Sequence, residues 1–179
     1  MMERAQRGVF FAHGLTDTEI VNLEERHGFR FPPDLRGFLQ TALPVGSLFP
    51  DWRSLDDSTV RERLSWPEHG ILFDVESNSF WLPEWGPRPV SIEDAKEIAR
   101  HYIRQAPKLI PVYSHRMMPE TPHLAGNPVL SVYQTDIIYY GFDLDDYFRH
   151  EFGLPKRKPW PSEIRPIAFW EVERWQELQ

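Results

Sequence analysis

The sequence predicts an α+β fold in which helices pack around an antiparallel or mixed sheet. Three segments carry the spacing of amphipathic helices and begin at residues that cap helices. A later region holds short runs rich in Val, Ile and Tyr, interrupted by turn residues, which is typical of strands. Because the chain has 179 residues, it is long enough to bury one substantial core and to form one domain.

The first two helices follow from local capping signals near the N-terminus. Thr16 and Glu19 form a T-x-x-E capping box for a helix over Asp17–His27. Gly28 stands where a left-handed residue ends a helix. The pair Pro32-Pro33 then starts a second helix of about ten residues, because proline fits the first helical turn.

The middle of the chain is predicted to form a short helix followed by a β-hairpin. Asp57–Leu64 carries apolar residues at helical spacing, and Trp66-Pro67 closes it. Ile71–Val75 and Phe80–Leu82 are then candidate strands, because the turn-like triplet Glu76-Ser77-Asn78 lies between them.

A third helix leads into the first strand of the main sheet. Ser91 caps a helix from Ile92 to about Gln105, and Pro107 stops it. Leu109–His115 then alternates as a strand. Because Pro111 cannot donate to a ladder, this strand lies at an edge or pairs on one side at that point.

The remaining strands and the last predicted capped helix lie close together. Arg116–Pro128 is predicted to be a long loop that ends in a turn, and Val129–Gln134 is predicted to be a strand. Ile137–Tyr140 is either a strand continuation or one short helical turn, and the pattern leaves both open. Asp143 then caps a short amphipathic helix.

The two ends of the chain carry weaker signals. Residues 1–13 are predicted to be a flexible arm, with Val9-Phe10-Phe11 as a docking patch. The single domain covers residues 14–179. Within it, residues 154–179 form a C-terminal extension, first basic and proline-rich and then apolar, that packs back on the body with a helix reaching Leu178.

Two segments resemble a known family. Residues 14–46 read GLTDTEIVNLEERHGFRFPPDLRGFLQTALPVG, and residues 128–153 read PVLSVYQTDIIYYGFDLDDYFRHEFG. They are similar to the opening and C-terminal parts of the SUKH superfamily, which includes a yeast cell-wall assembly regulator and many bacterial immunity proteins. The resemblance implies one sheet with helices around it. It also implies a non-enzymatic protein that binds another protein inside the cell.

Composition excludes several classes of protein. The chain has no cysteine, which rules out disulfides and thiolate metal sites and fits a cytoplasmic location. No apolar run approaches the roughly 20 residues of a membrane helix, and the N-terminal apolar patch is too short for a signal peptide. The net charge of −7 argues against direct binding of nucleic acid. Residues 134–152 alone hold five acids against one base.

Catalytic and metal-binding patterns are weak. His115 and His123 flank the predicted loop and Asp136 could approach them, but no histidine pair has the spacing of a zinc site. Asp136 with Asp143 or Asp145 could form a carboxylate pair, yet the helix start already explains the last two. We therefore predict no metal, no cofactor and no enzymatic activity.

Aromatic, basic and acidic residues near the strand ends predict a surface that binds a protein. Tyr, Trp and Arg are enriched at binding hot spots, and an acidic surface favours a basic partner such as a nuclease toxin domain. A regulatory or scaffold module without a toxin partner is the alternative function. The predicted partner-binding residues are Trp81, Trp85, Tyr113, His115, Arg116, Tyr133, Asp136, Tyr139, Tyr140, Asp143 and Asp145.

Overall fold

The computed structural model describes residues 9–54 and 56–177 and confirms the α+β class. A small antiparallel sheet pairs β1 (Phe10–His13) with β2 (Ala42–Val45). The main antiparallel sheet has the order β3-β4-β5-β6, formed by Leu109–Tyr113, Arg116–Pro119, Val129–Tyr133 and Asp136–Gly141. The helices are α1 (Asp17–His27), α2 (Pro33–Thr41), α3 (Ser58–Ser77), α4 (Ile92–Gln105), α5 (Leu144–Glu151) and α6 (Val172–Gln176), with a 3₁₀ turn η1 (Pro83–Trp85).

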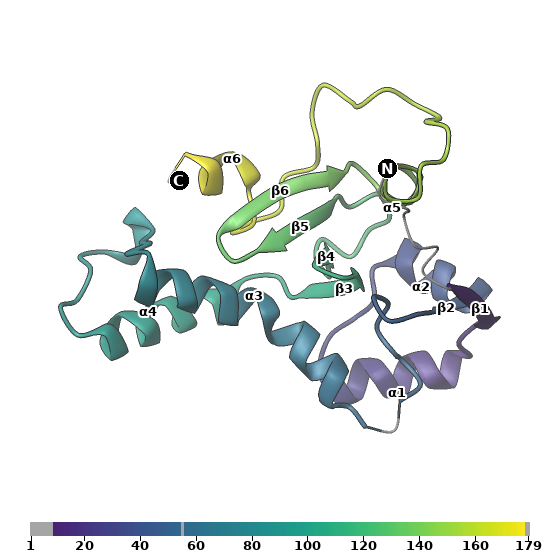
Figure 1. Cartoon of the computed structure of the whole chain (residues 1–179), viewed down its shortest axis with the longest axis horizontal. Helices are drawn as coiled ribbons and strands as arrows, with labels where there is room; N and C mark the ends of the chain where they lie inside the picture. The colour runs from purple at the N-terminus through teal and green to yellow at the C-terminus, as the bar shows by residue number, and fades with distance from the viewer. Residues whose placement is uncertain (1–8, 55, 178–179) are drawn as a thin grey trace, which may run out of the picture.

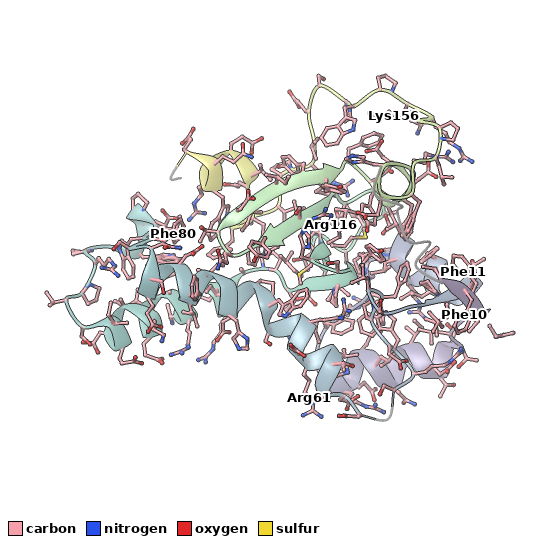
Figure 2. All side chains as sticks on the ribbon, in the orientation of Figure 1. Phe10, Phe11, Arg61, Phe80, Arg116 and Lys156 are labelled. Carbon is pink, nitrogen blue, oxygen red and sulfur yellow. The ribbon has the colours of Figure 1, made fainter. Side chains whose placement is uncertain are left out.

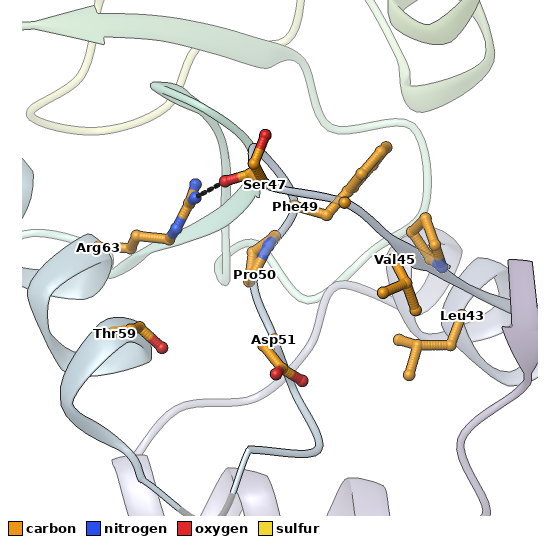
Figure 3. Close-up of a pocket in the computed structure, with 10 residues that line it drawn as sticks. Leu43, Val45, Ser47, Phe49, Pro50, Asp51, Thr59 and Arg63 are labelled. Carbon is orange, nitrogen blue, oxygen red and sulfur yellow. Dashed lines mark hydrogen bonds between the residues drawn. The ribbon is translucent and has the colours of Figure 1, made fainter. Parts of the chain in front are cut away.

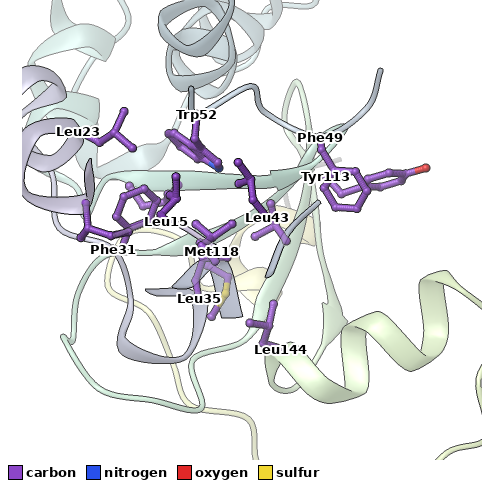
Figure 4. Packing of buried hydrophobic residues seen from close by; sticks show 14 of the residues in the cluster. Leu15, Leu23, Phe31, Leu35, Leu43, Phe49, Trp52, Tyr113, Met118 and Leu144 are labelled. Atoms are coloured by element: carbon purple, nitrogen blue, oxygen red, sulfur yellow. The ribbon is translucent and has the colours of Figure 1, made fainter. Parts of the chain in front are cut away.

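The main sheet separates two hydrophobic cores. Side chains that alternate along the strands, such as Ile110 and Met118, pack on α1, α2 and α5 in the first core. Their neighbours Leu109 and Met117 pack on α3, α4 and α6 in the second core. Figure 1 shows α1, α2 and the small sheet grouped together, with α3 and α4 running below the main sheet. Figure 4 shows part of the first core, including Met118.

Local capping signals predicted α1 and α4 well. At α1, Thr16 Oγ1 accepts from the backbone N of Glu19 at 3.2 Å, and the Glu19 carboxylate accepts from the backbone N of Thr16 at 2.8 Å. Gly28 ends this helix with a φ of 64°. Ser91 caps α4, whose bounds match the prediction. These signals work because they involve neighbours in sequence.

The predicted short helix and hairpin in the middle of the chain are wrong. Residues 58–77 form α3, one helix of 20 residues with Pro67 inside it. Proline normally ends a helix because it lacks a backbone N–H. Here the Pro67 ring is buried, and Val60, Ile71 and Val75 continue the buried stripe on both sides of it. Packing of that stripe outweighs the local breaking signal, and the predicted turn at Ser77 is the end of the helix.

Other segments also differ from the prediction. Phe10–His13, expected in a flexible arm, is strand β1 and pairs with β2, whereas residues 1–8 lie outside the described part. The predicted loop over 116–128 begins with β4, which completes a hairpin after a two-residue turn. Residues 137–140 belong to strand β6, so the helical alternative is wrong.

An irregularity in β3 moves Tyr113 to the other face of the sheet. The pairing register between β3 and β4 shifts between Pro111 and Tyr113, which breaks strict alternation. Strict alternation over the predicted strand Leu109–His115 would put Tyr113 on the same face as Leu109, but Tyr113 packs in the first core, 4.7 Å from Phe49 between ring centroids. Pro111 lies in an edge strand, as predicted.

The C-terminal segment packs on the body. Residues 152–163 are exposed and arch over the main sheet in Figure 1. Ile167, Trp170 and Trp175 then fill the second core beside β6. Helix α6 is short and ends at Gln176, and Leu178 lies outside the described residues.

We expect two helical glycines to respond in opposite ways to alanine. A Cβ at Gly70 of α3 would lie 2.8 Å from Cα of Gln134, whereas a Cβ at Gly37 of α2 would meet nothing within 4 Å. Alanine is favoured over glycine inside a helix by about 1 kcal/mol. Gly37→Ala should therefore raise the free energy of unfolding by about 0.5–1 kcal/mol. Gly70→Ala should lower it by about 1–3 kcal/mol.

Urea unfolding of both variants measures this difference, because the helical preference is shared and only the contact with Gln134 differs. A Gly70→Ala protein as stable as Gly37→Ala would contradict the close approach of α3 to the β5–β6 turn.

Candidate protein-binding surface

The predicted binding residues do not form one surface. The fold distributes them among the interior, the N-terminus of α5 and the end of the main sheet where the strands turn.

Arg116 lies inside the protein and joins four elements. Its guanidinium carbon is 3.5 Å from the ring centroid of Tyr140 on β6. Its Nη1 donates to Ser131 Oγ on β5 at 2.6 Å, and its Nε lies 3.5 Å from a carboxylate oxygen of Glu151 on α5. Only 12% of the Arg116 side chain is exposed, and Figure 2 places it at the centre of the main sheet. Arg116 and Tyr140 therefore hold α5 on the sheet, and Tyr113 is buried beside them.

The two tryptophans and Tyr139 belong largely to the second core. Trp85 is buried in η1, and Tyr139 packs against the same cluster, where burial raises the pKa of its hydroxyl. Trp81 is half-buried, contacts Trp85 edge to face at 5.1 Å, and donates its Nε1–H to the carbonyl of Gly86. Of these three residues, Trp81 is the one that lines a surface hollow.

The acidic residues near α5 are used by local structure. Asp143 caps the helix by accepting from the backbone N of Asp146 at 2.8 Å. Asp145 accepts from Arg149 at 2.9 Å, and this hydrogen bond lowers the pKa of the Asp145 carboxyl. Asp146 is buried and Glu151 faces Arg116. Of the five acids in residues 134–152, all except Asp136 are therefore engaged in contacts within the fold.

The turn end of the main sheet rests on α3. Ser114 in the β3–β4 turn and Gln134 in the β5–β6 turn both have positive φ, 51° and 57°. The backbone of Gln134 lies against Gly70. The carbonyl of Ser114 accepts from Nη1 of Arg63 on α3. Two hairpin turns are thus fixed on one helix.

Large aromatic side chains are exposed at this end of the sheet. Trp66 and Phe73 flank Gly70 at four and three residues, so all three lie on one side of α3. Tyr133 comes directly before Gln134. The exposed fractions are 37% for Trp66, 50% for Phe73 and 64% for Tyr133. Together with His115 and Asp136, which lie on the same two turns, these residues define the turn surface.

The aromatic residues of the turn surface have rigid support. Arg63 lies 5.7 Å from the ring of Trp66 and donates to the carbonyls of Ser47 and Leu48 at 3.1 and 3.0 Å. Burial lowers the pKa of the Arg63 guanidinium. Figure 3 shows Arg63 bonded to Ser47 at the rim of a pocket of about 440 Å³ whose wall includes Phe49. Because the hydrogen bonds of Arg63 go to backbone carbonyls, we assign it to positioning the loop and Trp66.

His115 connects the interior to the turn surface. Arg116 Nη1 donates to His115 Nε2, and the His115 ring contacts Tyr133 edge to face at 6.0 Å. Burial and the Arg116 charge lower the pKa of His115, while the Asp136 charge opposes that shift. The ring therefore acts as a neutral acceptor for Arg116.

Four predicted residues therefore reach the turn end, namely Trp81, His115, Tyr133 and Asp136, and the prediction missed Trp66 and Phe73. The short-helix and hairpin prediction placed Trp66 in a closing dipeptide and Phe73 in a strand. The spacing of Trp66, Gly70 and Phe73 would have indicated a common helical face, had the segment been recognised as one helix.

Comparison with known proteins identifies neither a family nor a function for the chain. No protein-family model, curated protein or solved structure matches the chain. The SUKH resemblance therefore stays a prediction.

Within residues 9–54 and 56–177, no three His, Asp or Glu side chains gather closely enough to hold a metal ion. The helices in that part of the chain are also too short or too polar to cross a membrane.

We expect His115 to titrate below its ordinary pKa of 6.5, as followed by NMR of its ring protons. Asp136→Asn should lower that pKa further, because it removes the charge that favours the protonated ring. Since the unfolded chain binds the proton more readily, the stabilising contribution of the neutral ring is complete above about pH 6.5 and declines as the pH falls below that value. His115→Gln should make this decline less steep. Part of the decline should remain, because burial also lowers the pKa of His27. A higher His115 pKa in Asp136→Asn would contradict the proximity of the two groups.

Substitutions at Tyr140 and at Asp136 should change the free energy of unfolding by different amounts, because Tyr140 packs in the interior and Asp136 lies on the surface. Tyr140→Ala loses the contact with Arg116 and the stacking on His150 at 4.5 Å, so we expect a loss of about 2 kcal/mol in the free energy of unfolding. Asp136→Ala should change it by less than about 0.5 kcal/mol. Urea midpoints compare the two proteins, and equal losses would show that Asp136 is also structural.

Proposed function

We propose that the chain is a non-enzymatic protein-binding module, most specifically an immunity protein of the SUKH type that neutralises a toxin domain in the cytoplasm by forming a direct complex. The observation that carries the proposal is the exposure of Trp66, Phe73 and Tyr133 around the contact between Gly70 and Gln134. The resemblance of residues 14–46 and 128–153 to SUKH sequences supports the more specific part.

The turn surface has the properties of a binding hot spot. Aromatic side chains supply large contact areas for few rotatable bonds, and clusters of them on soluble proteins mark interaction sites. The turn surface also lies on a helix and two fixed turns, so little conformational entropy would be lost on binding. Arg63 adds to this rigidity by holding Trp66.

Net charge favours a basic partner. The chain carries −7 at neutral pH, and a field of this sign speeds the approach of a positively charged toxin domain, such as a nuclease. The acids of α5 are paired or capping and contribute at long range. Asp136 adds an exposed carboxylate within the turn surface.

Capture of partners from a lysate of the native host tests the proposal. The bait is the wild-type chain, a Trp66→Ala, Phe73→Ala double variant, or a control variant with Trp160→Ala and Leu154→Ala. The control residues are 41% and 52% exposed, comparable with the pair under test, and lie away from the turn surface. We expect one dominant basic protein, released at moderate salt, to be captured by the wild type and the control. The double variant should bind it at least about 100-fold more weakly.

Co-expression then separates the two candidate functions. If the captured protein is toxic alone and harmless with the wild-type chain, and the double variant fails to protect, the immunity function is supported. A set of several partners with no toxicity would favour a regulatory or scaffold module. Unchanged binding by the double variant would overturn the role of the turn surface.

A further inference from the structure

A hollow of about 450 Å³ adjoins the turn surface. It lies between the C-terminal end of α3 and the β5–β6 turn. Its wall includes Asp74 and Asn78 from the helix end, Phe80 and Trp81 from the following segment, and Tyr133 and Asp136 from the hairpin. Figure 2 marks Phe80 at this end of the molecule.

The hollow carries negative charge from two directions. Asp136 is exposed and pairs in register with Tyr133, so both side chains project from the same face of the hairpin. Asp74 is 3% exposed, and its carboxylate accepts from the backbone N and the hydroxyl of Thr135 and from the amide of Asn78, at 2.9, 2.7 and 2.6 Å. These donors are neutral, so they hold Asp74 in place without cancelling its charge.

The end of α3 strengthens this preference. Carbonyl groups of the last helical turn carry partial negative charge, which favours cations near a helix C-terminus. Arg88 of the chain itself already contacts one side of this helix end. Its Nη2 donates to the carbonyl of Val75 at 2.7 Å, and its guanidinium carbon lies 6.0 Å from the ring of Trp81. The chain thus places a guanidinium beside the same helix end and the same aromatic ring.

We propose that the hollow receives an arginine side chain of the partner. This inference rests on the proposed function and adds the chemistry that the partner must present next to the turn surface. A planar guanidinium can bond the Asp136 carboxylate with two N–H groups and stack on an aromatic face such as that of Tyr133 or Trp81. A lysine ammonium lacks the fork and the planar face.

A small probe tests the hollow without the partner. N-acetyl-arginine methylamide is titrated into the full chain, with the lysine and citrulline counterparts as comparisons, and amide and indole N–H signals are followed by NMR. We expect saturable shifts at millimolar concentration for Thr135, Asp136 and the Trp81 indole. Citrulline, which has the shape without the charge, should cause none of them, and lysine should bind at least 3-fold more weakly.

Matched variants locate the response. Asp136→Asn should weaken arginine binding about 10-fold or more. Asp145→Asn, which removes the same charge at the N-terminus of α5, should leave it unchanged. The inference is overturned if the arginine probe causes no shift, if citrulline acts equally, or if Asp136→Asn binds as wild type. Equal binding of the lysine probe would overturn the choice of arginine.

The probe titration tests the hollow and the capture experiment tests the proposed function, so a negative result in one is distinguishable from a negative result in the other. If Trp66→Ala with Phe73→Ala abolishes capture while the arginine probe causes no shift, the binding function stands and the inference about the hollow is wrong. If the probe binds at Asp136 while the wild-type chain captures no dominant partner, the hollow is a cation site and the proposed function is wrong.

Discussion

The contact between α3 and the β5–β6 turn fixes much of the rest of the structure. Gly70 lets the backbone of Gln134 approach the helix, and four residues further on Asp74 accepts two hydrogen bonds from Thr135. Both interactions come from the part of α3 that follows Pro67. They place the β5–β6 turn, with the exposed Tyr133, beside the helix face that carries Trp66 and Phe73.

Elements defined by neighbours in sequence could be predicted, whereas α3 could not. The capping box at Thr16 and the cap at Ser91 act within one turn, so their residues are sufficient to start α1 and α4. Pro67 is an equally local signal, but it predicts the end of a helix. Burial of the α3 stripe against strands that lie more than forty residues later in the chain outweighs this signal. Local rules fail where distant packing supplies the larger free energy.

The types of residue that form the binding surface could be predicted, but the individual residues that belong to it could not. Composition indicated that Tyr, Arg and Asp near the strand ends could recognise a partner, but it could not separate Arg116, which lies beneath Tyr140, from Asp136 at the turn. The two differ through the cross-strand register and through the placement of α5 over Arg116. Acids that appeared as a patch in the sequence are instead distributed between a cap, an ion pair and the interior.

The division into two cores also orders the events of synthesis. The first core draws its buried residues from Leu15 through Tyr147, so it can close as soon as Tyr147 has left the ribosome. The second core also needs Trp170 and Trp175, which are synthesised more than twenty residues later. Until they arrive, the face of the sheet that packs on α3 and α4 is left open on the nascent chain, and this half-finished state is the one most exposed to aggregation and to chaperones. A chain that stopped before Trp170 would stay in that state permanently.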